Sequence, residues 1–299
     1  MLVLSVSSLT LGVLLFAGFL WYRQAGAQHA QPIAAFPPAP VLDPAALTAK
    51  SALLYDPASG RVLFAKEPDV SRPLASLTKL MSATVILESG QQPLNTPVTL
   101  TAADVSTEGD AGDWNLHAGD TATLGDLIKF GLVASSNYAM AAAAASLDGD
   151  YVRDMNRTAG ALGLSATYFL NPTGLDINTE ISGAYGSAYD VAKLAAAFLR
   201  DYPQFFQLTT KPTVSITASG KQLVANATTL PLLDTPGFIG AKTGYTDLAG
   251  GNLVAAFDID VGHPLIAVVL GSSEIGRFSD IRTLINAARA AALASSTPL

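Results

Sequence analysis

The sequence has no cysteine, and its 299 residues include only three histidines. Without cysteine, the chain can form no disulfide bond, no thiolate nucleophile and no cysteine-ligated metal site. The histidines, His29, His117 and His263, lie far apart and lack the spacing of metal ligands. We therefore expect neither a metal ion nor any other cofactor.

Charged residues are also scarce, at 14% of the chain, and they form no basic run. The net charge is -7, whereas proteins that bind nucleic acids neutralise phosphates with clustered lysine and arginine. We therefore expect no nucleic-acid partner. Hydrophobic residues make up 49% of the sequence, which is enough for a large folded core.

The N-terminal run of the sequence has no charged side chain before Arg23. A helix that spans a bilayer needs about 20 apolar residues, and residues 2–21 supply them. Ala25-Gly26-Ala27 also fits the pattern that signal peptidase cleaves, although a basic n-region is missing. We interpret residues 1–23 as a cleaved signal peptide or a retained membrane anchor. In both cases the rest of the chain works outside the cytoplasm, in the periplasm or at the cell surface.

Two further regions follow this leader. Residues 24–48 are rich in alanine and proline and indicate an extended tether, and residues 49–295 are expected to form the catalytic domain. The domain begins with two apolar runs around a Pro-Ala-Ser-Gly turn, which predict a β-hairpin over 51–67. Periodicity and capping residues predict helices at 76–89, 124–134, 138–147, 150–162, 187–202 and 276–295, and strands at 213–218, 221–226, 238–243, 250–258 and 264–270.

The order of these elements is hairpin, helices, strands and a closing helix. A parallel doubly wound sheet would instead show strict alternation of strands and helices. The order predicts an α+β fold in which one antiparallel sheet, completed by both ends of the domain, is flanked by helices. A mostly helical subdomain is inserted between the two parts of the sheet.

One lysine, Lys79, lies in the apolar stretch "RPLASLTKLMSA", three positions after Ser76. On a helix, side chains at i and i+3 share one face and can touch. An apolar setting lowers the pKa of a lysine, and a neutral amine is the base that a serine nucleophile needs. At the start of a helix, the free amide of Ser76 is also suited to stabilise an oxyanion. The alternative is a chance Ser-x-x-Lys pattern whose lysine reaches water.

Two more segments carry polar residues suited to a cleft. "GLVASSNYAM" places Ser135 and Asn137 at a break between two helices, where an ordinary helix cap is the alternative. "GFIGAKTGYTDLAGGNLVAAF" places Lys242, Thr243 and Gly244 on a strand. The cation and hydroxyl suit a carboxylate, and glycine allows close approach of a substrate backbone. The alternative here is a lysine that ends an edge strand.

Ser-x-x-Lys, Ser-x-Asn and Lys-Thr-Gly, in this order, resemble the motifs of penicillin-binding serine peptidases and serine β-lactamases. "RPLASLTKLMSA", "FLNPTGLD" and "KTGYTDLAGGNLV" are most similar to the low-molecular-mass penicillin-binding proteins of the D-alanyl-D-alanine carboxypeptidase family. The likeness covers roughly residues 50–290, and three ordered motifs make it specific.

The resemblance implies a serine-type enzyme that trims peptidoglycan stem peptides ending in D-Ala-D-Ala and is inhibited covalently by β-lactams. In the catalytic part of the site, Ser76 would be the acylated nucleophile and Lys79 its base. Ser135 would relay a proton to the leaving group, and Asn137 would hold Lys79 and the substrate amide.

The resemblance also implies a substrate-binding part of the site. Lys242 and Thr243 would bind the terminal carboxylate, beside Gly244. The backbone amides of Ser76 and Tyr245 would form the oxyanion hole. Ser136 stands where the family commonly has glycine, which leaves open whether Ser135 or Ser136 faces the site.

Several alternative functions stay open at this point. Thr173 stands where many carboxypeptidases have histidine, and D,D-endopeptidases, which cleave cross-links, also have threonine there. A β-lactamase would need a deacylating base, for which Glu180 is the one candidate in its loop. A non-catalytic penicillin-binding sensor is a further reading. A Ser-His-Asp hydrolase is disfavoured because no G-x-S-x-G sequence is present.

Overall fold

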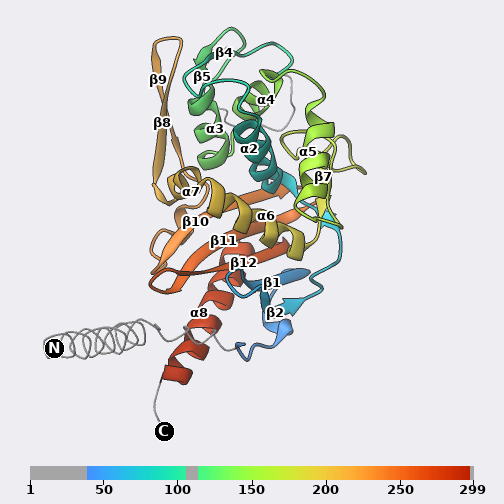
Figure 1. Ribbon diagram of the computed structural model, residues 1–299, viewed down its shortest axis with the longest axis vertical. Coiled ribbons are helices and arrows are strands. Elements are labelled where there is room, and N and C mark those ends of the chain that lie inside the picture. The colour runs from blue at the N-terminus through green and yellow to red at the C-terminus, as the bar shows by residue number, and fades with distance from the viewer. Residues whose placement is uncertain (1–38, 106–113, 297–299) are drawn as a thin grey trace, which may run out of the picture. The chain divides into compact units, whose positions relative to one another are not determined.

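The computed structural model of the protein describes residues 39–105 and 114–296. These residues form a five-stranded antiparallel sheet with the strand order β10-β11-β12-β1-β2 (Figure 1). The N-terminal hairpin of β1 (Ser51–Asp56) and β2 (Arg61–Lys66) joins this sheet by pairing with β12 (His263–Ser272). Both ends of the domain therefore complete one sheet, which confirms the predicted α+β architecture.

The sheet is buried on both faces. Along β11 (Gly250–Asp260), Leu253, Ala255 and Phe257 pack in one apolar cluster with α8 (Gly276–Ser296), whereas Val254 and Ala256 belong to the cluster of the helical subdomain. Successive side chains of a strand point to opposite faces, so β11 contributes to both clusters. The central strands consequently carry continuous apolar runs. Antiparallel sheets with one face in water instead alternate apolar and polar residues.

The inserted helical subdomain lies between β2 and β8 in the chain. It contains the long helices α2 (Thr78–Ser89), α3 (Leu124–Val133), α4 (Asn137–Ala145), α5 (Tyr151–Ala161) and α6 (Ala188–Asp201). Helix α2 contacts all four of the others, and every side chain from Thr78 to Ile86 is buried (Figure 1). A helix buried on all sides has no polar face, so Lys79 on α2 lies in the interior.

The remaining predicted elements are β8 (Thr213–Ala218), β9 (Lys221–Asn226) and β10 (Phe238–Thr246). The sequence did not predict several short ones, because two to five residues leave no periodic pattern. These are the strands β3 (Arg72–Pro73), β4 (Pro97–Thr99), β5 (Thr121–Thr123), β6 (Tyr168–Phe169) and β7 (Ala184–Gly186), the helix α7 (Pro203–Gln207), and the 3-10 helices η1 (Pro44–Ala46), η2 (Ala75–Leu77), η3 (Leu208–Thr210) and η4 (Leu230–Leu232).

The predicted leader, residues 1–23, lies outside the described residues. Within 39–105 and 114–296, no helix is both long enough and apolar enough to span a membrane. The last part of the predicted tether contacts the domain, because Leu47 is buried and Thr48 donates two hydrogen bonds to Asp280. The domain boundary at residue 49 stays a prediction.

Asp280 on α8 generates a stability prediction. Its side chain is 2% exposed and accepts hydrogen bonds from Thr48 N, Thr48 Oγ1, Ala49 N and Ser272 Oγ, so it ties the start of the domain to its last helix. We expect Asp280→Ala to lower the free energy of unfolding by about 3 kcal/mol, because buried donors lose their acceptor. Urea unfolding measures the change.

The matched control is Asp69→Ala, which removes an exposed carboxylate that makes no side-chain hydrogen bond within the described part of the chain. A surface change of this kind shifts stability by less than about 0.5 kcal/mol. Equal midpoints for the two variants would contradict the role given to Asp280.

Candidate active site

Lys79 is the centre of the candidate site, and its side chain is 0% exposed. Its Nζ lies 2.7 Å from Ser76 Oγ, 2.5 Å from Asn137 Oδ1 and 3.2 Å from the carbonyl oxygen of Thr173. Ser76 lies in η2, directly before α2, so the predicted i, i+3 contact is present. Three segments distant in sequence therefore converge on one amine.

The backbone before the nucleophile has an unusual conformation. Ala75 has φ = 49°, in the left-handed region that L-residues other than glycine rarely adopt. Leu74 and Leu77, on either side, are buried, whereas Ser76 between them keeps partial exposure. The turn thus presents one hydroxyl to the site while its apolar neighbours pack into the core. Conformations of this kind persist only where the surrounding structure holds them.

The two serines between α3 and α4 have different environments. Ser135 has φ = 63°, and its Oγ accepts a hydrogen bond from Lys242 Nζ at 2.8 Å. Ser136 is the N-cap of α4, where its Oγ accepts a hydrogen bond from Ala139 N at 3.1 Å. The two alternatives predicted for this segment, a polar residue in the cleft and a helix cap, are therefore both present, in adjacent residues. Ser135 faces the second lysine of the site, and Ser136 caps the helix.

Lys242 on β10 is fully buried and donates to Ser135 Oγ and to the carbonyl oxygen of Thr243, each at 2.8 Å. Burial holds the pKa of Lys242 well below its usual value of 10.5, and Lys79, when it is protonated, and Arg277 lower it further. Two amines close to one another in a buried site disfavour double protonation, so the electrostatics of Lys79 and Lys242 are linked.

Gly244 follows Thr243 on β10 and packs against the turn that carries Ser76. A Cβ at residue 244 would lie 2.8 Å from Leu74 O and 3.1 Å from Ser76 N. The sequence predicted that glycine would make room for a substrate backbone. The structure shows a different reason, because the space of the missing side chain is filled by the protein's own backbone. Glycine here lets the strand approach the nucleophile.

Two further predicted binding residues, Thr243 and Tyr245, flank Gly244 on β10. Thr243 is buried and donates from Oγ1 to Thr228 Oγ1 at 2.7 Å. Tyr245 follows Gly244 on β10 and is 46% exposed. The structure therefore links Ser76, Lys79 and Asn137 around one amine, pairs Ser135 with Lys242, and places Gly244 against the Ser76 turn. Thr243 and Tyr245 belong to the same strand, β10.

The sequence did not identify the 171–176 loop as part of the site. In the sequence, the side chain of Thr173 is the feature that differs from many carboxypeptidases. In the structure, the carbonyl oxygen of Thr173 is the atom that contacts Lys79. Asn171 shapes the loop, because its Oδ1 accepts from Gly174 N at 2.7 Å and its Nδ2 donates to Leu175 O at 2.9 Å. Every residue has a backbone carbonyl, so contacts made by carbonyl oxygens produce no residue-type pattern in a sequence. The one local signal for this loop is the Asn-x-x-Gly pattern, which is typical of a turn.

Arg277 was missed as well. Its side chain is 7% exposed, and its Nη1 donates to the carbonyl oxygen of Gly244 at 2.8 Å. Burial lowers the pKa of Arg277 from its usual value. It supports β10 from behind and adds positive charge near Lys242. A single arginine in the first turn of the last helix has no distinguishing sequence context.

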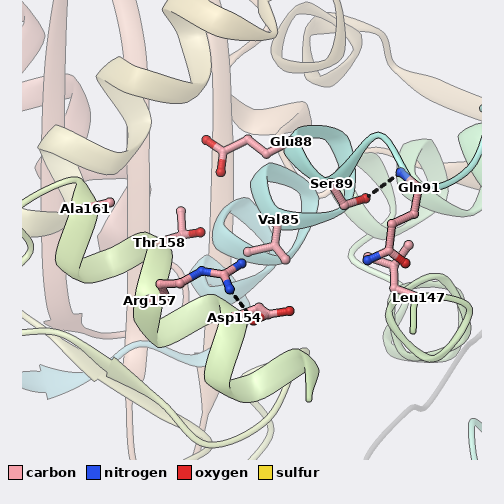
Figure 2. A pocket seen from close by; sticks show the side chains of 9 residues that line it. All are labelled: Val85, Glu88, Ser89, Gln91, Leu147, Asp154, Arg157, Thr158 and Ala161. Carbon is pink, nitrogen blue, oxygen red and sulfur yellow. Dashed lines mark hydrogen bonds and ion pairs between the residues drawn. The ribbon is translucent and has the colours of Figure 1, made fainter. Parts of the chain in front are cut away.

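A separate pocket of about 500 Å³ lies at the opposite end of α2 (Figure 2). Figure 2 shows Arg157 turned toward Asp154 on α5, while Glu88 extends from α2. Arg157 Nη1 lies 3.1 Å from Asp154 Oδ1. Burial and the charge of Asp201 raise the pKa of Glu88. None of the predicted site residues lines this pocket, so it is distinct from the Lys79 site.

Gly174 generates a prediction about the 171–176 loop. Its φ is 80°, and a Cβ there would lie 1.9 Å from Ala75 O. We expect Gly174→Ala to displace the loop from Lys79 and Ser76 and to lower the rate of covalent labelling by a fluorescent penicillin by about 100-fold. The control is Gly220→Ala, where φ is 77° but the added Cβ meets open space.

The control separates backbone strain from steric displacement. Both variants carry the cost of a left-handed alanine, about 1–2 kcal/mol, and thermal unfolding measures it. Only Gly174→Ala should lose labelling. Equal labelling by the two variants would show that the loop does not position the site.

Comparison with known proteins agrees with this geometry. The chain is 30% identical over 244 residues to a D-alanyl-D-alanine endopeptidase of Pseudomonas aeruginosa, covering 80% of this chain and 76% of the relative. It is 32% identical over 235 residues to a D-alanyl-D-alanine carboxypeptidase of Haemophilus influenzae. That match covers 76% of this chain but 58% of the relative, so the chain spans little more than half of that enzyme.

A solved structure shows the same fold. Penicillin-binding protein D2 of Listeria monocytogenes, in its ampicillin-bound form, superposes with a TM-score of 0.71 and 29% sequence identity, covering 81% of this chain and 98% of that one. The family model described as D-alanyl-D-alanine carboxypeptidase matches residues 38–274, which include the whole of the site around Lys79 except Arg277. The chain therefore belongs to the D-alanyl-D-alanine carboxypeptidase family of low-molecular-mass penicillin-binding proteins.

Proposed function

We propose that this protein is a serine-type D-alanyl-D-alanine carboxypeptidase that acts on peptidoglycan stem peptides through an acyl-enzyme. The observation that carries the proposal is the 2.7 Å contact between the buried amine of Lys79 and the hydroxyl of Ser76. An amine without access to water favours its neutral form, and a neutral amine can take a proton from serine. Family membership and the named relatives support the same activity.

In the acylation step, Ser76 Oγ attacks the carbonyl carbon of the penultimate D-alanine. The hydroxyl proton passes to Lys79 Nζ as the C–O bond forms. The backbone amides of Ser76 and Tyr245 stabilise the negative charge that develops on the carbonyl oxygen. The C–N bond then breaks, and the proton held on Lys79 Nζ passes through Ser135, which lies next to Lys242, to the nitrogen of the departing D-alanine. Lys79 thereby returns to its neutral form.

In the deacylation step, water attacks the ester between Ser76 and the shortened peptide. The water gives its proton to Lys79 Nζ, and the serine hydroxyl is restored as the carboxylate product leaves. Asn137 holds the amine in place during both steps, since its Oδ1 lies 2.5 Å from Lys79 Nζ. The side-chain amide of Asn137 also has an NH2 group, which can donate a hydrogen bond that orients the peptide.

The substrate ends in a carboxylate, and Lys242 and Thr243 are suited to bind it. A charged lysine and a hydroxyl provide charge-assisted and neutral hydrogen bonds to carboxylate oxygens. Arg277, behind Gly244, adds positive charge near this end of the cleft. β-Lactams carry a carboxylate and a strained amide, so the same groups explain why we expect them as covalent inhibitors.

A D,D-endopeptidase that cleaves cross-links is the second candidate. Thr173 and the 30% identity to the Pseudomonas endopeptidase favour it, and the chemistry at Ser76 would be the same. The difference lies in what the cleft admits beyond the reacting bond. Digestion of purified sacculi distinguishes the two, because release of free D-alanine indicates the carboxypeptidase and loss of cross-links indicates the endopeptidase.

Two other readings have weaker support. Glu180, the candidate deacylating base of a β-lactamase, is exposed to solvent on its loop. A non-catalytic penicillin-binding sensor would not need the short contacts among Ser76, Lys79 and Asn137. We therefore retain the peptidase assignment.

The proposed substrate lies outside the cytoplasm, which supports the predicted export of the chain. Residues 2–21 would serve as an anchor in the cytoplasmic membrane or as part of a signal peptide, and this stays a prediction. Periplasmic and cell-surface locations are both compatible with the proposed activity.

Covalent acylation tests the proposal directly. After exposure to penicillin, intact-mass measurement should find one adduct on the wild-type protein and none on Ser76→Ala, which lacks the nucleophile. Lys79→Ala should keep a folded circular-dichroism spectrum and lose acylation by about 1,000-fold or more, as expected when a nucleophile loses its base. A wild-type protein without an adduct would refute the proposed function, and an unfolded Lys79→Ala would point to a structural role.

The lowered pKa of Lys242 predicts a pH dependence. As pH rises through this pKa, the ammonium loses its proton, so attraction for the substrate carboxylate falls at a lower pH than the roughly 10.4 of an ordinary lysine. We therefore expect kcat/KM for a D-Ala-D-Ala peptide to fall, on the alkaline side of its pH profile, at a pH below the pKa of an ordinary lysine.

Lys242→Arg should move this alkaline limb to higher pH, because a guanidinium keeps its charge. The exposed Lys211→Arg is the matched control and should leave the profile unchanged. A wild-type profile that stays flat up to about pH 10.4 would contradict the assignment of the carboxylate to Lys242.

A further inference from the structure

The 171–176 loop ends at Asp176, whose carboxylate reaches the turn between β10 and β11. Its Oδ1 accepts a hydrogen bond from Thr246 Oγ1 at 3.1 Å, and its Oδ2 accepts from Leu248 N at 3.3 Å. Within the described part of the chain, no other hydrogen bond joins this loop to the turn 246–249. Asp176 takes no part in the reaction steps proposed above.

The other end of the loop is fixed to the helices that carry the nucleophile and its base. The carbonyl oxygen of Pro172 accepts from Ser82 Oγ at 2.5 Å, and that of Thr173 accepts from Lys79 Nζ. Gly174 lies against the carbonyl of Ala75 so closely that no Cβ fits. The loop is therefore held in one position relative to η2 and α2.

The turn after β10 closes the hairpin with β11, in which Thr246 pairs with Gly250. Thr246 Oγ1 accepts from Ala249 N at 3.2 Å, which closes the turn, and Asp247 at its tip is exposed. Tyr245, directly before the turn, is 46% exposed. The ladder with β11 and the hydrogen bond from Arg277 Nη1 to Gly244 O hold this end of β10 within the sheet. Asp176 adds the contact that fixes it relative to the 171–176 loop and, through that loop, relative to Ser76.

We propose that Asp176 is a positioning residue for the reaction. It joins the 171–176 loop to the β10–β11 turn and so fixes the backbone amide of Tyr245 relative to Ser76. This inference rests on the proposed function, in which that amide stabilises the oxyanion. Donors aimed at a developing charge act only when they are held in place, and a displacement of about 1 Å costs about 100-fold in rate.

Kinetics of Asp176→Ala test the inference. The oxyanion exists only in the transition state, so we expect kcat for a D-Ala-D-Ala peptide and the rate of penicillin acylation to fall about 10- to 100-fold. KM should stay within about twofold, and the pH profile should not move, because Lys79 and Lys242 keep their surroundings. Asp120→Ala is the matched control, since Asp120 is a half-buried carboxylate that accepts from a backbone amide, His117 N, in another turn. This control should retain wild-type rates.

A second pair of variants keeps the test decisive if Asp176→Ala does not fold. Thr246→Val removes the hydroxyl that donates to Asp176 and should lower kcat, whereas Thr246→Ser keeps that donor and should restore it. The inference is overturned if Asp176→Ala folds and acylates at the wild-type rate, or if Thr246→Ser and Thr246→Val have equal kcat. It is also overturned if the loss appears in KM alone.

These outcomes are separable from failure of the proposed function. If wild-type protein forms no penicillin adduct, the peptidase assignment fails and the role of Asp176 fails with it. If wild-type protein is acylated at Ser76 and the Asp176 and Thr246 variants match it, only the role of Asp176 fails.

Discussion

Burial of a single amine is the constraint on which the rest of the site depends. An amine removed from water is costly unless its hydrogen-bonding groups find partners. Lys79 meets three oxygen atoms, from Ser76, Asn137 and Thr173, and each comes from a different part of the chain. The fold therefore brings the α3–α4 junction and the 171–176 loop to the start of α2, where η2 already places Ser76 beside the amine. The contacts that satisfy the buried amine of Lys79 also arrange Ser76 and Asn137 for acyl transfer.

Much of this arrangement could be predicted from the sequence because it depends on residue type and spacing. Helices α5 and α6 have a clear amphipathic periodicity, whereas α2 and the central strands are marked by continuous apolar runs. Ser76, Lys79, Asn137 and Lys242 are polar residues in apolar settings, which distinguishes them. The choice between Ser135 and Ser136 could not be predicted, because two adjacent serines differ only in backbone conformation, and φ = 63° at Ser135 is a tertiary effect.

The roles of other parts of the site could not be predicted from the sequence. Thr173 acts through its carbonyl oxygen, which every residue has, and Asp176 acts through a turn 70 residues away. The reason for Gly244 was also not predictable, because it depends on how closely β10 packs against the turn at Ala75. Propensity describes local structure, whereas these contacts exist only after distant segments have met.

The pairing of β1 with β12 has a kinetic consequence. Ser51 pairs with Leu270 and Tyr55 with Ile266, so the first strand of the sheet must wait for a partner strand that lies far along the chain. Pairings between such distant residues must overcome a large loss of chain entropy before they gain any contacts, and proteins rich in them fold slowly. A chain of this protein thus cannot complete its five-stranded sheet, and stays accessible to chaperones, until β12 is available to pair with β1.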